Sequence, residues 1–147
     1  MPPSPPETGG GLTVASFNVL NYFQTLDNAG RRCGPGRDKG CRGADSDAEF
    51  QRQRAKILGA LAAIRADLFG LIELENTAGV KPAAELAAGL NALLGEEKYV
   101  ALDTGIMGAD VIRVGMIYRP EKLEPVGDFA VLDGGVDPRF NDRKNRP

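Results

Sequence analysis

The sequence predicts an α/β fold, and three segments in chain order carry this prediction. Residues 12–19 have the β-branched and aromatic content of a strand, residues 46–65 have the apolar spacing of a helix, and residues 67–74 form a second strand-like apolar run. A strand, a crossover that contains a helix and another apolar strand are the layout of an α/β domain. With 147 residues, of which 42% are apolar, the chain is long enough for one such domain.

The first predicted strand follows a proline- and glycine-rich stretch at residues 1–11, which we interpret as a linker. Alternate side chains of a strand point to opposite faces, so Leu12, Val14, Ser16 and Asn18 share one face. Asn18 therefore lies at the C-terminal end of the strand. Asparagine is also a common turn former or cap, so this position alone does not assign it a function.

A long irregular segment, residues 20–45, follows and contains both cysteines of the chain, Cys33 and Cys41. Two thiols without nearby histidine cannot complete a four-ligand zinc site, and a disulfide is favoured over two free thiols. Basic residues outnumber acidic ones here: Arg31, Arg32, Arg37, Lys39 and Arg42. In a chain of net charge -2 this local excess is the best candidate for contacting a polyanion, the alternative being a solvated loop.

The first predicted helix begins at a capping-box pattern formed by Ser46 and Glu49, and it extends to about Arg65. Its apolar residues recur at spacings of three and four: Phe50, Ile57, Leu58, Leu61 and Ile64. The strand at residues 67–74 begins almost at once after the helix.

That strand is the central run of the sequence, and it ends in two acids and an amide: Glu73, Glu75 and Asn76. Large apolar side chains occupy nearly consecutive positions before them, so we expect both faces of the strand to be buried. An unpaired charge in a dry core is very costly, so the acids mark either a solvated corner or a site that requires negative charge. The stretch alone favours neither interpretation.

The remaining elements are a helix and three short strands. Pro82 opens the second predicted helix and Gly95 ends it, with Leu86, Leu90, Leu93 and Leu94 on its buried face. Strands are predicted at residues 99–102, 111–118 and 126–132, of which the second has the clearest pattern.

Composition excludes several classes of protein. The chain has no histidine, which rules out a histidine base, a histidine metal site and a Ser-His-Asp nucleophile within it. The sequence contains no apolar run of about 18 residues, so it predicts no membrane span. Its first residues lack the basic and apolar regions of a signal peptide. The net charge of -2 argues against nucleic-acid binding by bulk electrostatics but not against an enzyme with a local basic patch.

Five segments together carry a family resemblance: residues 16–23 (Ser-Phe-Asn-Val-Leu-Asn-Tyr-Phe), Cys33 with residues 41–44 (Cys-Arg-Gly-Ala), Arg52 with Gln53, residues 66–76 ending in Glu-Leu-Glu-Asn, and residues 114–120 (Val-Gly-Met-Ile-Tyr-Arg-Pro). In this order they resemble the N-terminal half of the endonuclease/exonuclease/phosphatase superfamily, which has DNase I-like folds. Within it, the bacterial extracellular nucleases are the most similar group. The resemblance covers nearly the whole chain.

The resemblance implies a four-layer α/β sandwich, of which this chain is the N-terminal half, and a site at one end of its sheets. Glu73, six residues after Asp67, takes the family's position of the carboxylate that binds the divalent metal, Mg²⁺ or else Mn²⁺ or Ca²⁺. Asn18 takes the position that orients the phosphate or belongs to the metal site. Arg119 is implied as a phosphate contact, and four loop arginines are candidate nucleic-acid contacts: Arg31, Arg32, Arg37 and Arg42.

The implied function is metal-dependent phosphodiester hydrolysis by a secreted or periplasmic nuclease acting on DNA or RNA. Two alternatives remain: a phosphatase or phospholipid phosphodiesterase of the same superfamily, and a non-catalytic binding module that keeps the half-fold. The family supplies histidine and further aspartates from a later half. We therefore expect residues 12–147 to be the N-terminal portion of the domain, inactive alone and prone to self-association through exposed sheet edges.

Overall fold

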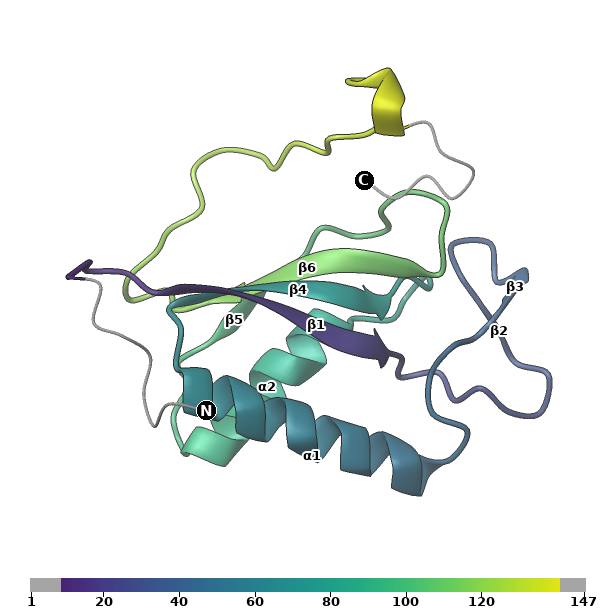
Figure 1. Ribbon diagram of the computed structural model, residues 1–147, viewed down its shortest axis with the longest axis horizontal. Coiled ribbons are helices and arrows are strands. Elements are labelled where there is room, and N and C mark those ends of the chain that lie inside the picture. The colour runs from purple at the N-terminus through teal and green to yellow at the C-terminus, as the bar shows by residue number, and fades with distance from the viewer. Residues whose placement is uncertain (1–8, 141–147) are drawn as a thin grey trace.

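The computed structural model describes residues 9–140 and shows one mixed sheet with two helices on one of its faces (Figure 1). The order of strands across the sheet is β1 (Val14–Tyr22), β4 (Leu68–Glu75), β6 (Ile112–Tyr118) and β5 (Val100–Leu102). The helices are α1 (Asp47–Ile64) and α2 (Pro82–Leu94). The predicted α/β class is thus confirmed. No helix within residues 9–140 is long and apolar enough to cross a membrane.

Strands β1 and β4 run parallel, whereas β4 with β6 and β5 with β6 are antiparallel. The crossover from β1 to β4 contains α1, as predicted. Because the two strands are parallel neighbours, their C-terminal ends meet at one edge of the sheet. Asn18 there lies opposite Ile72, one residue before Glu73.

Both helix starts and ends follow the predicted signals. Ser46 caps α1, its hydroxyl oxygen accepting the Glu49 N–H at 3.4 Å, while the Glu49 carboxylate accepts the Asp45 N–H rather than that of Ser46. Pro82 lies in the first turn of α2, and Gly95 ends the helix with a left-handed backbone at φ 71°. Such a φ costs glycine little, because it has no side chain to clash with the backbone.

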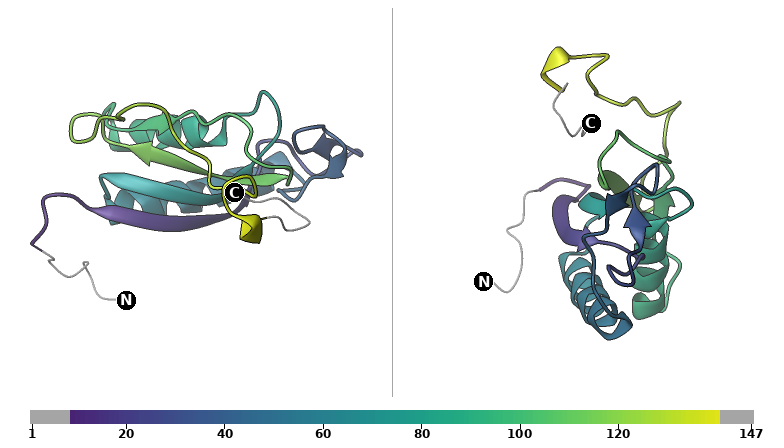
Figure 2. Two further views of the ribbon diagram at one scale, coloured as in Figure 1. Left: turned by 90° about the horizontal axis from the view of Figure 1, so that it is seen from above. Right: turned by 90° about the vertical axis from the view of Figure 1, so that its right-hand side faces the viewer.

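The core lies between the helices and the sheet face that they cover (Figure 2). Phe69, Leu71 and Leu74 of β4 contribute to it, and Ile117 of β6 is fully buried beside them. The helices add the following buried side chains: Ile57, Leu58 and Leu61 from α1, and Leu86 and Leu90 from α2. Leu93 was expected on the buried face of α2 but is 55% exposed.

The other face of the sheet is bare, which contradicts the prediction that β4 is buried on both faces. Ile72 is 39% exposed, and several apolar residues of the other strands are also exposed on this sheet: Val14, Val100, Val114 and Met116. Both helices pack on the opposite side, and the segment after β6 rises over the bare face without forming a ladder (Figures 1 and 2).

Of two further predictions, the strand at residues 126–132 is wrong, and the linker at residues 1–11 is largely untested. Residues 126–132 were predicted as a strand, but they pair with no strand among the described residues, and Val126 is 95% exposed. A strand pattern needs a hydrogen-bonding neighbour, and the described residues provide none beside this segment. The predicted linker at residues 1–11 falls largely on residues 1–8, which lie outside the described residues.

Candidate functional site

Paired irregularities interrupt β1 and β4 at the edge where both strands end. The register between them shifts between Asn18 and Tyr22, and the register between β4 and β6 shifts between Leu71 and Leu74. Leu20, Asn21 and Glu73 occupy these bulges with φ of 56°, 52° and 68°. Residues other than glycine rarely adopt this left-handed conformation. Bulges and such conformations concentrate near functional sites, where they redirect side chains.

The bulges bring Asn18 and Glu73 together, as the family resemblance implied for these two residues at strand ends. Oδ1 of Asn18 accepts the N–H of Leu20 at 2.8 Å, and Oε2 of Glu73 accepts the N–H of Asn21 at 3.1 Å. The oxygens of both side chains therefore accept hydrogen bonds from the same two-residue bulge. Asn18 is exposed and Glu73 is half-buried, so the pair is open to solvent.

This donor set fits Mg²⁺ and does not fit a zinc site. Within residues 9–140 no group of three or more His, Cys, Asp or Glu side chains could hold a metal. Magnesium in proteins is bound through one or two carboxylates together with water and substrate oxygens, whereas zinc needs three or four protein ligands. Glu73 supplies one carboxylate, and its Oε1 makes no hydrogen bond within the described residues. Asn18 supplies an amide oxygen beside it.

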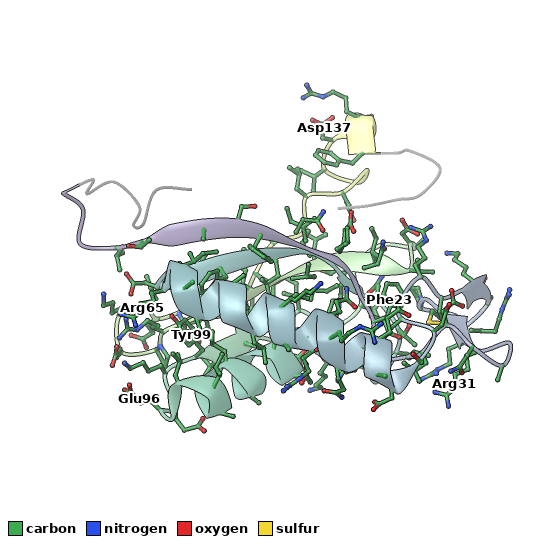
Figure 3. All side chains as sticks on the ribbon, turned by 60° about the horizontal axis from the view of Figure 1, so that its bottom comes forward. Phe23, Arg31, Arg65, Glu96, Tyr99 and Asp137 are labelled. Carbon is green, nitrogen blue, oxygen red and sulfur yellow. A yellow bond between two sulfur atoms is a disulfide. The ribbon has the colours of Figure 1, made fainter. Side chains whose placement is uncertain are left out.

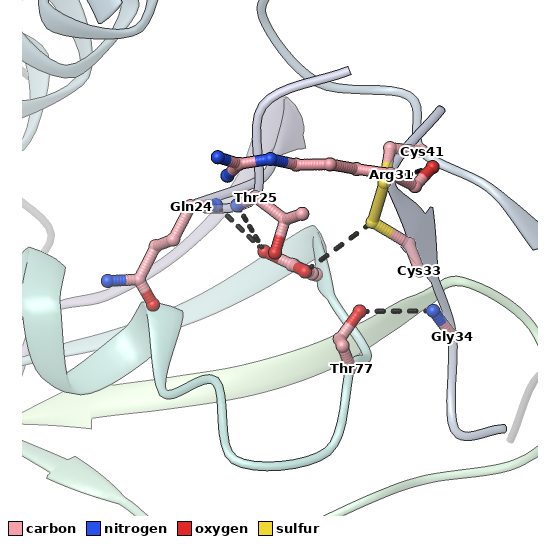
Figure 4. Close-up of a disulfide and its surroundings, with 8 residues drawn as sticks. Gln24, Thr25, Arg31, Cys33, Gly34, Cys41 and Thr77 are labelled. Atoms are coloured by element: carbon pink, nitrogen blue, oxygen red, sulfur yellow. Dashed lines mark hydrogen bonds between the residues drawn. A yellow bond between two sulfur atoms is a disulfide. The ribbon is translucent and has the colours of Figure 1, made fainter. Parts of the chain in front are cut away.

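Glu75 and Asn76 are fully buried, so this end of β4 is not the solvated corner that the sequence allowed. Oε2 of Glu75 accepts the N–H groups of Gln24 and Thr25 at 2.8 and 3.0 Å, and its Oε1 lies 3.6 Å from Sγ of Cys33 (Figure 4). In an uninterrupted strand, Glu75 would share the face of Glu73, two residues earlier. The bulge at Glu73 instead separates the two carboxylates, and Glu75 anchors the loop that follows β1.

That loop is ordered around a disulfide, which confirms the predicted pairing of Cys33 with Cys41. The disulfide packs with Phe23 and Val111 in a second, smaller core. A short ladder of β2 (Arg32–Cys33) and β3 (Lys39–Gly40) brackets it. The N–H of Gly34 donates to the hydroxyl of Thr77 at 3.0 Å (Figure 4), which ties the loop to the chain just after β4. The loop therefore borders the Asn18 and Glu73 edge of the sheet.

The four loop arginines predicted to contact nucleic acid are all exposed on this loop: Arg31, Arg32, Arg37 and Arg42. Two of them are tethered to neighbouring segments. A guanidinium N–H of Arg37 donates to the carbonyl of Ala78 at 2.9 Å, and Arg42 lies 3.6 Å from a carboxylate oxygen of Asp110. Figure 3 shows Arg31 at the same end of the molecule as Phe23 and far from Arg65.

Arg119 lies at the opposite end of the sheet from Asn18 and Glu73, and its role as a phosphate contact stays a prediction. Because β6 runs antiparallel to β4, Arg119 follows the strand end that faces Asp67. Its guanidinium lies 3.3 Å from the Asp67 carboxylate and also pairs with Glu121. Asp67 and Glu73 are six positions apart along the chain, which in an extended strand is at most about 20 Å.

Asp67 is the centre of a cluster of charged groups at the end of β4 opposite to Glu73. Its carboxylate is buried, lies 2.9 Å from the ammonium of Lys122 and accepts the N–H of Thr13 at 2.9 Å. The hydrogen bond from Lys122 is the main cause that holds the pKa of Asp67 below its usual value, with Thr13 and Arg119 adding to it against the effect of burial. This cluster fixes the start of β4 to the ends of β1 and β6.

Comparison with known protein families, curated proteins and solved structures finds no match to this chain. A functional proposal for this chain therefore rests on the geometry of its own residues.

Three residues that contribute to the site were not predicted from the sequence. Leu20 and Asn21 present their N–H groups to the site only because both adopt left-handed conformations. Gln53 of α1 holds this bulge, its side-chain amide donating to the carbonyls of Val19 and Leu20 at 3.2 and 2.7 Å. Gln53 belongs to a segment of the family resemblance, but spacing alone gave it no partner.

Proposed function

We propose that this chain contributes the Asn18 and Glu73 half of a divalent-metal-dependent phosphodiester hydrolase that acts on nucleic acid. One observation carries the proposal: the side-chain oxygens of Asn18 and Glu73 converge on a strained bulge at the open ends of two parallel strands. A site of this kind, with a single carboxylate and an amide exposed to solvent, suits a hard cation that shares its ligands with a substrate.

The chemistry of phosphodiester cleavage explains the residue types. Negative charge develops on the phosphoryl oxygens, so catalysis requires positive charge and hydrogen-bond donors placed beside them. A bound Mg²⁺ supplies that positive charge and orients the phosphate. Glu73 provides the negative charge that retains the cation. Asn18 turns its oxygen toward the N–H of Leu20, which leaves its Nδ2 without a partner in the described residues and able to donate to a phosphate oxygen.

The bare face of the sheet supports the finer fold proposal, a four-layer sandwich related to DNase I. A partner layer would cover the apolar side chains that are exposed on this face, and large exposed apolar patches are unusual on an isolated soluble domain. A second sheet packed there would extend the layers beyond the Asn18 side chain, which projects from the same face as Val14. The general base, for which the chain has no histidine, would then come from that second layer.

Nucleic acid is favoured over a lipid or sugar phosphate because the disulfide loop places exposed arginines at the same edge of the sheet. The disulfide itself is compatible with a secreted or periplasmic protein, since such bonds persist in oxidising compartments.

The test is divalent-dependent stabilisation, which does not require turnover. Mg²⁺ or Mn²⁺ should raise the melting temperature of the wild-type chain, because a ligand that binds only the folded state stabilises it in proportion to the logarithm of its concentration. Glu73→Gln should abolish this increase. Glu124→Gln, which removes an exposed carboxylate far along the chain, is the matched control and should retain it. Equal responses of all three proteins would refute the metal site and favour a non-catalytic binding module.

A further inference from the structure

A groove lies between the N-terminal half of α1 and the disulfide loop, next to the candidate metal site. We call it the α1 groove and define it by its lining residues: Leu20, Asn21, Arg42, Gly43, Ala44, Glu49, Arg52, Gln53 and Lys56. Its volume is about 500 Å³, and it is open to solvent. No proposed catalytic side chain projects into it.

The charge of the groove is positive although the chain as a whole carries -2. Arg42, Arg52 and Lys56 line it, against a single acid, Glu49. Glu49 is already engaged, because its Oε2 accepts the N–H of Asp45 at 3.0 Å. Arg52 and Lys56 are exposed, and neither forms an ion pair within residues 9–140. The groove therefore presents two unneutralised cations.

The placement of these two cations disfavours a purely structural explanation. Arg52 and Lys56 are four residues apart, so they lie on one face of α1 as neighbours. Like charges at this spacing destabilise a helix by a few tenths of a kcal/mol rather than stabilise it. Their arrangement in a row suits successive charges of a polyanion better than a single isolated phosphate.

The groove is continuous with the candidate site through one shared segment. Leu20 and Asn21 line the groove, and their N–H groups are also the ones bound by Asn18 and Glu73. Gln53, which also lines the groove, donates from its side-chain amide to the carbonyl of Leu20 at 2.7 Å. The Leu20 side chain is 75% exposed at this junction, an apolar surface on which a base or sugar can rest.

We propose that the α1 groove binds the phosphodiester backbone of a nucleic-acid strand beside the cleaved bond, with Arg52 and Lys56 contacting phosphates. This inference rests on the proposed function for the identity of the polymer. It assigns substrate contacts to α1, in addition to the disulfide loop where the sequence placed them.

The experiment measures binding of a fluorescently labelled oligothymidylate by the full chain in EDTA, by anisotropy over a series of salt concentrations. Arg52→Gln and Lys56→Gln should each weaken binding several-fold at low salt. Each should also lower the slope of log affinity against log salt by about 0.7, the value for one lost phosphate contact on a single strand. Arg65→Gln is the matched control. It removes one charge from an exposed position at the opposite end of the same helix region (Figure 3) and should leave both quantities unchanged.

Three outcomes would overturn the inference. The wild-type chain could fail to bind the oligonucleotide, the three variants could lose affinity equally, or vesicles containing phosphatidylserine could bind through Arg52 and Lys56 while the oligonucleotide does not. Melting curves check that each variant is folded. We expect all of them to fold, because the side chains of Arg52 and Lys56 are exposed. The metal site is tested separately. If Glu73→Gln leaves the response to Mg²⁺ intact while Arg52→Gln weakens oligonucleotide binding, the hydrolase proposal fails and the groove stands.

Discussion

Asn18 and Glu73, which belong to neighbouring parallel strands, accept hydrogen bonds from two consecutive N–H groups, those of Leu20 and Asn21. Each side chain thereby holds one residue of a bulge whose backbone is left-handed at both positions. Such conformations cost of order 1 kcal/mol or more per residue and persist only where the surroundings fix them. The candidate site and the strained backbone are therefore one structural unit, and changing either should affect the other.

Gln53→Ala tests this coupling from outside the metal site. The variant loses the two hydrogen bonds to the carbonyls of Val19 and Leu20, so we expect the free energy of unfolding to fall by about 1–2 kcal/mol. The looser bulge should also reduce the stabilisation by Mg²⁺. Urea denaturation and melting with and without Mg²⁺ measure the two effects. Gln51→Ala, at an exposed position two residues earlier, should change neither. A normal Mg²⁺ response in Gln53→Ala would show that the bulge does not support the metal site.

Gly43→Ala should destabilise the protein by overpacking the small core of the disulfide loop. A Cβ at Gly43 would lie 2.4 Å from Cβ of Phe23, and Phe23 is fully buried and cannot move aside freely. Overpacking of this kind costs about 1–3 kcal/mol. Gly40→Ala is the comparison, because a Cβ there meets nothing within 4 Å. The prediction fails if the two variants have the same urea midpoint.

Removal of the disulfide should destabilise the chain through its unfolded state. Replacing Cys33 and Cys41 together by serine opens a short loop, and we expect a loss of about 2–3 kcal/mol in the free energy of unfolding. The wild-type protein in reductant should lose a similar amount, whereas the double variant should not respond to reductant. A wild-type protein unaffected by reduction would contradict the assignment of a stabilising role to this bond.

Comparison of these elements with the sequence shows which features a local pattern can determine. The limits of both helices followed from caps and apolar spacing, whereas the pairing of Asn18 with Glu73 was implied by the family resemblance. The bulges followed from neither, because a left-handed Leu20 or Glu73 has no signature comparable to glycine. The location of Arg119 at the other end of the sheet could not be predicted from its motif either. A sequence motif does not reveal strand direction. Because β6 runs antiparallel to β4, the C-terminal end of β6 lies at the other end of the sheet from Glu73.

Glu75 shows a second limit of the same kind. Its alternation with Glu73 predicted a shared face, yet the extra residue in the bulge reverses the facing of the side chains after it, as a one-residue slip does in any strand. The buried Glu75 then contacts the backbone after β1 instead of solvent. Sequence spacing is thus reliable within an uninterrupted strand and loses its meaning across a bulge, where functional side chains concentrate.

The cluster around Asp67 makes the stability of the chain depend on pH. Lys122 first, and then Thr13 and Arg119, hold the folded-state pKa of Asp67 below that of the unfolded chain, so the ionised form is bound more favourably in the folded state. The contribution is fully present above the unfolded pKa of about 4 and is lost as the pH falls through the lower folded pKa. Asp67→Asn should therefore reduce the free energy of unfolding by about 1–3 kcal/mol at neutral pH, because the buried carboxylate loses its charge-assisted bonds to Lys122 and Thr13. Urea denaturation at a series of pH values should show the free energies of unfolding of the wild-type and Asp67→Asn proteins converging on acidification.

Asp128→Asn, which changes an exposed position, is the control and should follow the wild-type curve throughout. A difference between wild type and Asp67→Asn that stays constant down to the lowest pH would contradict the role of ionised Asp67.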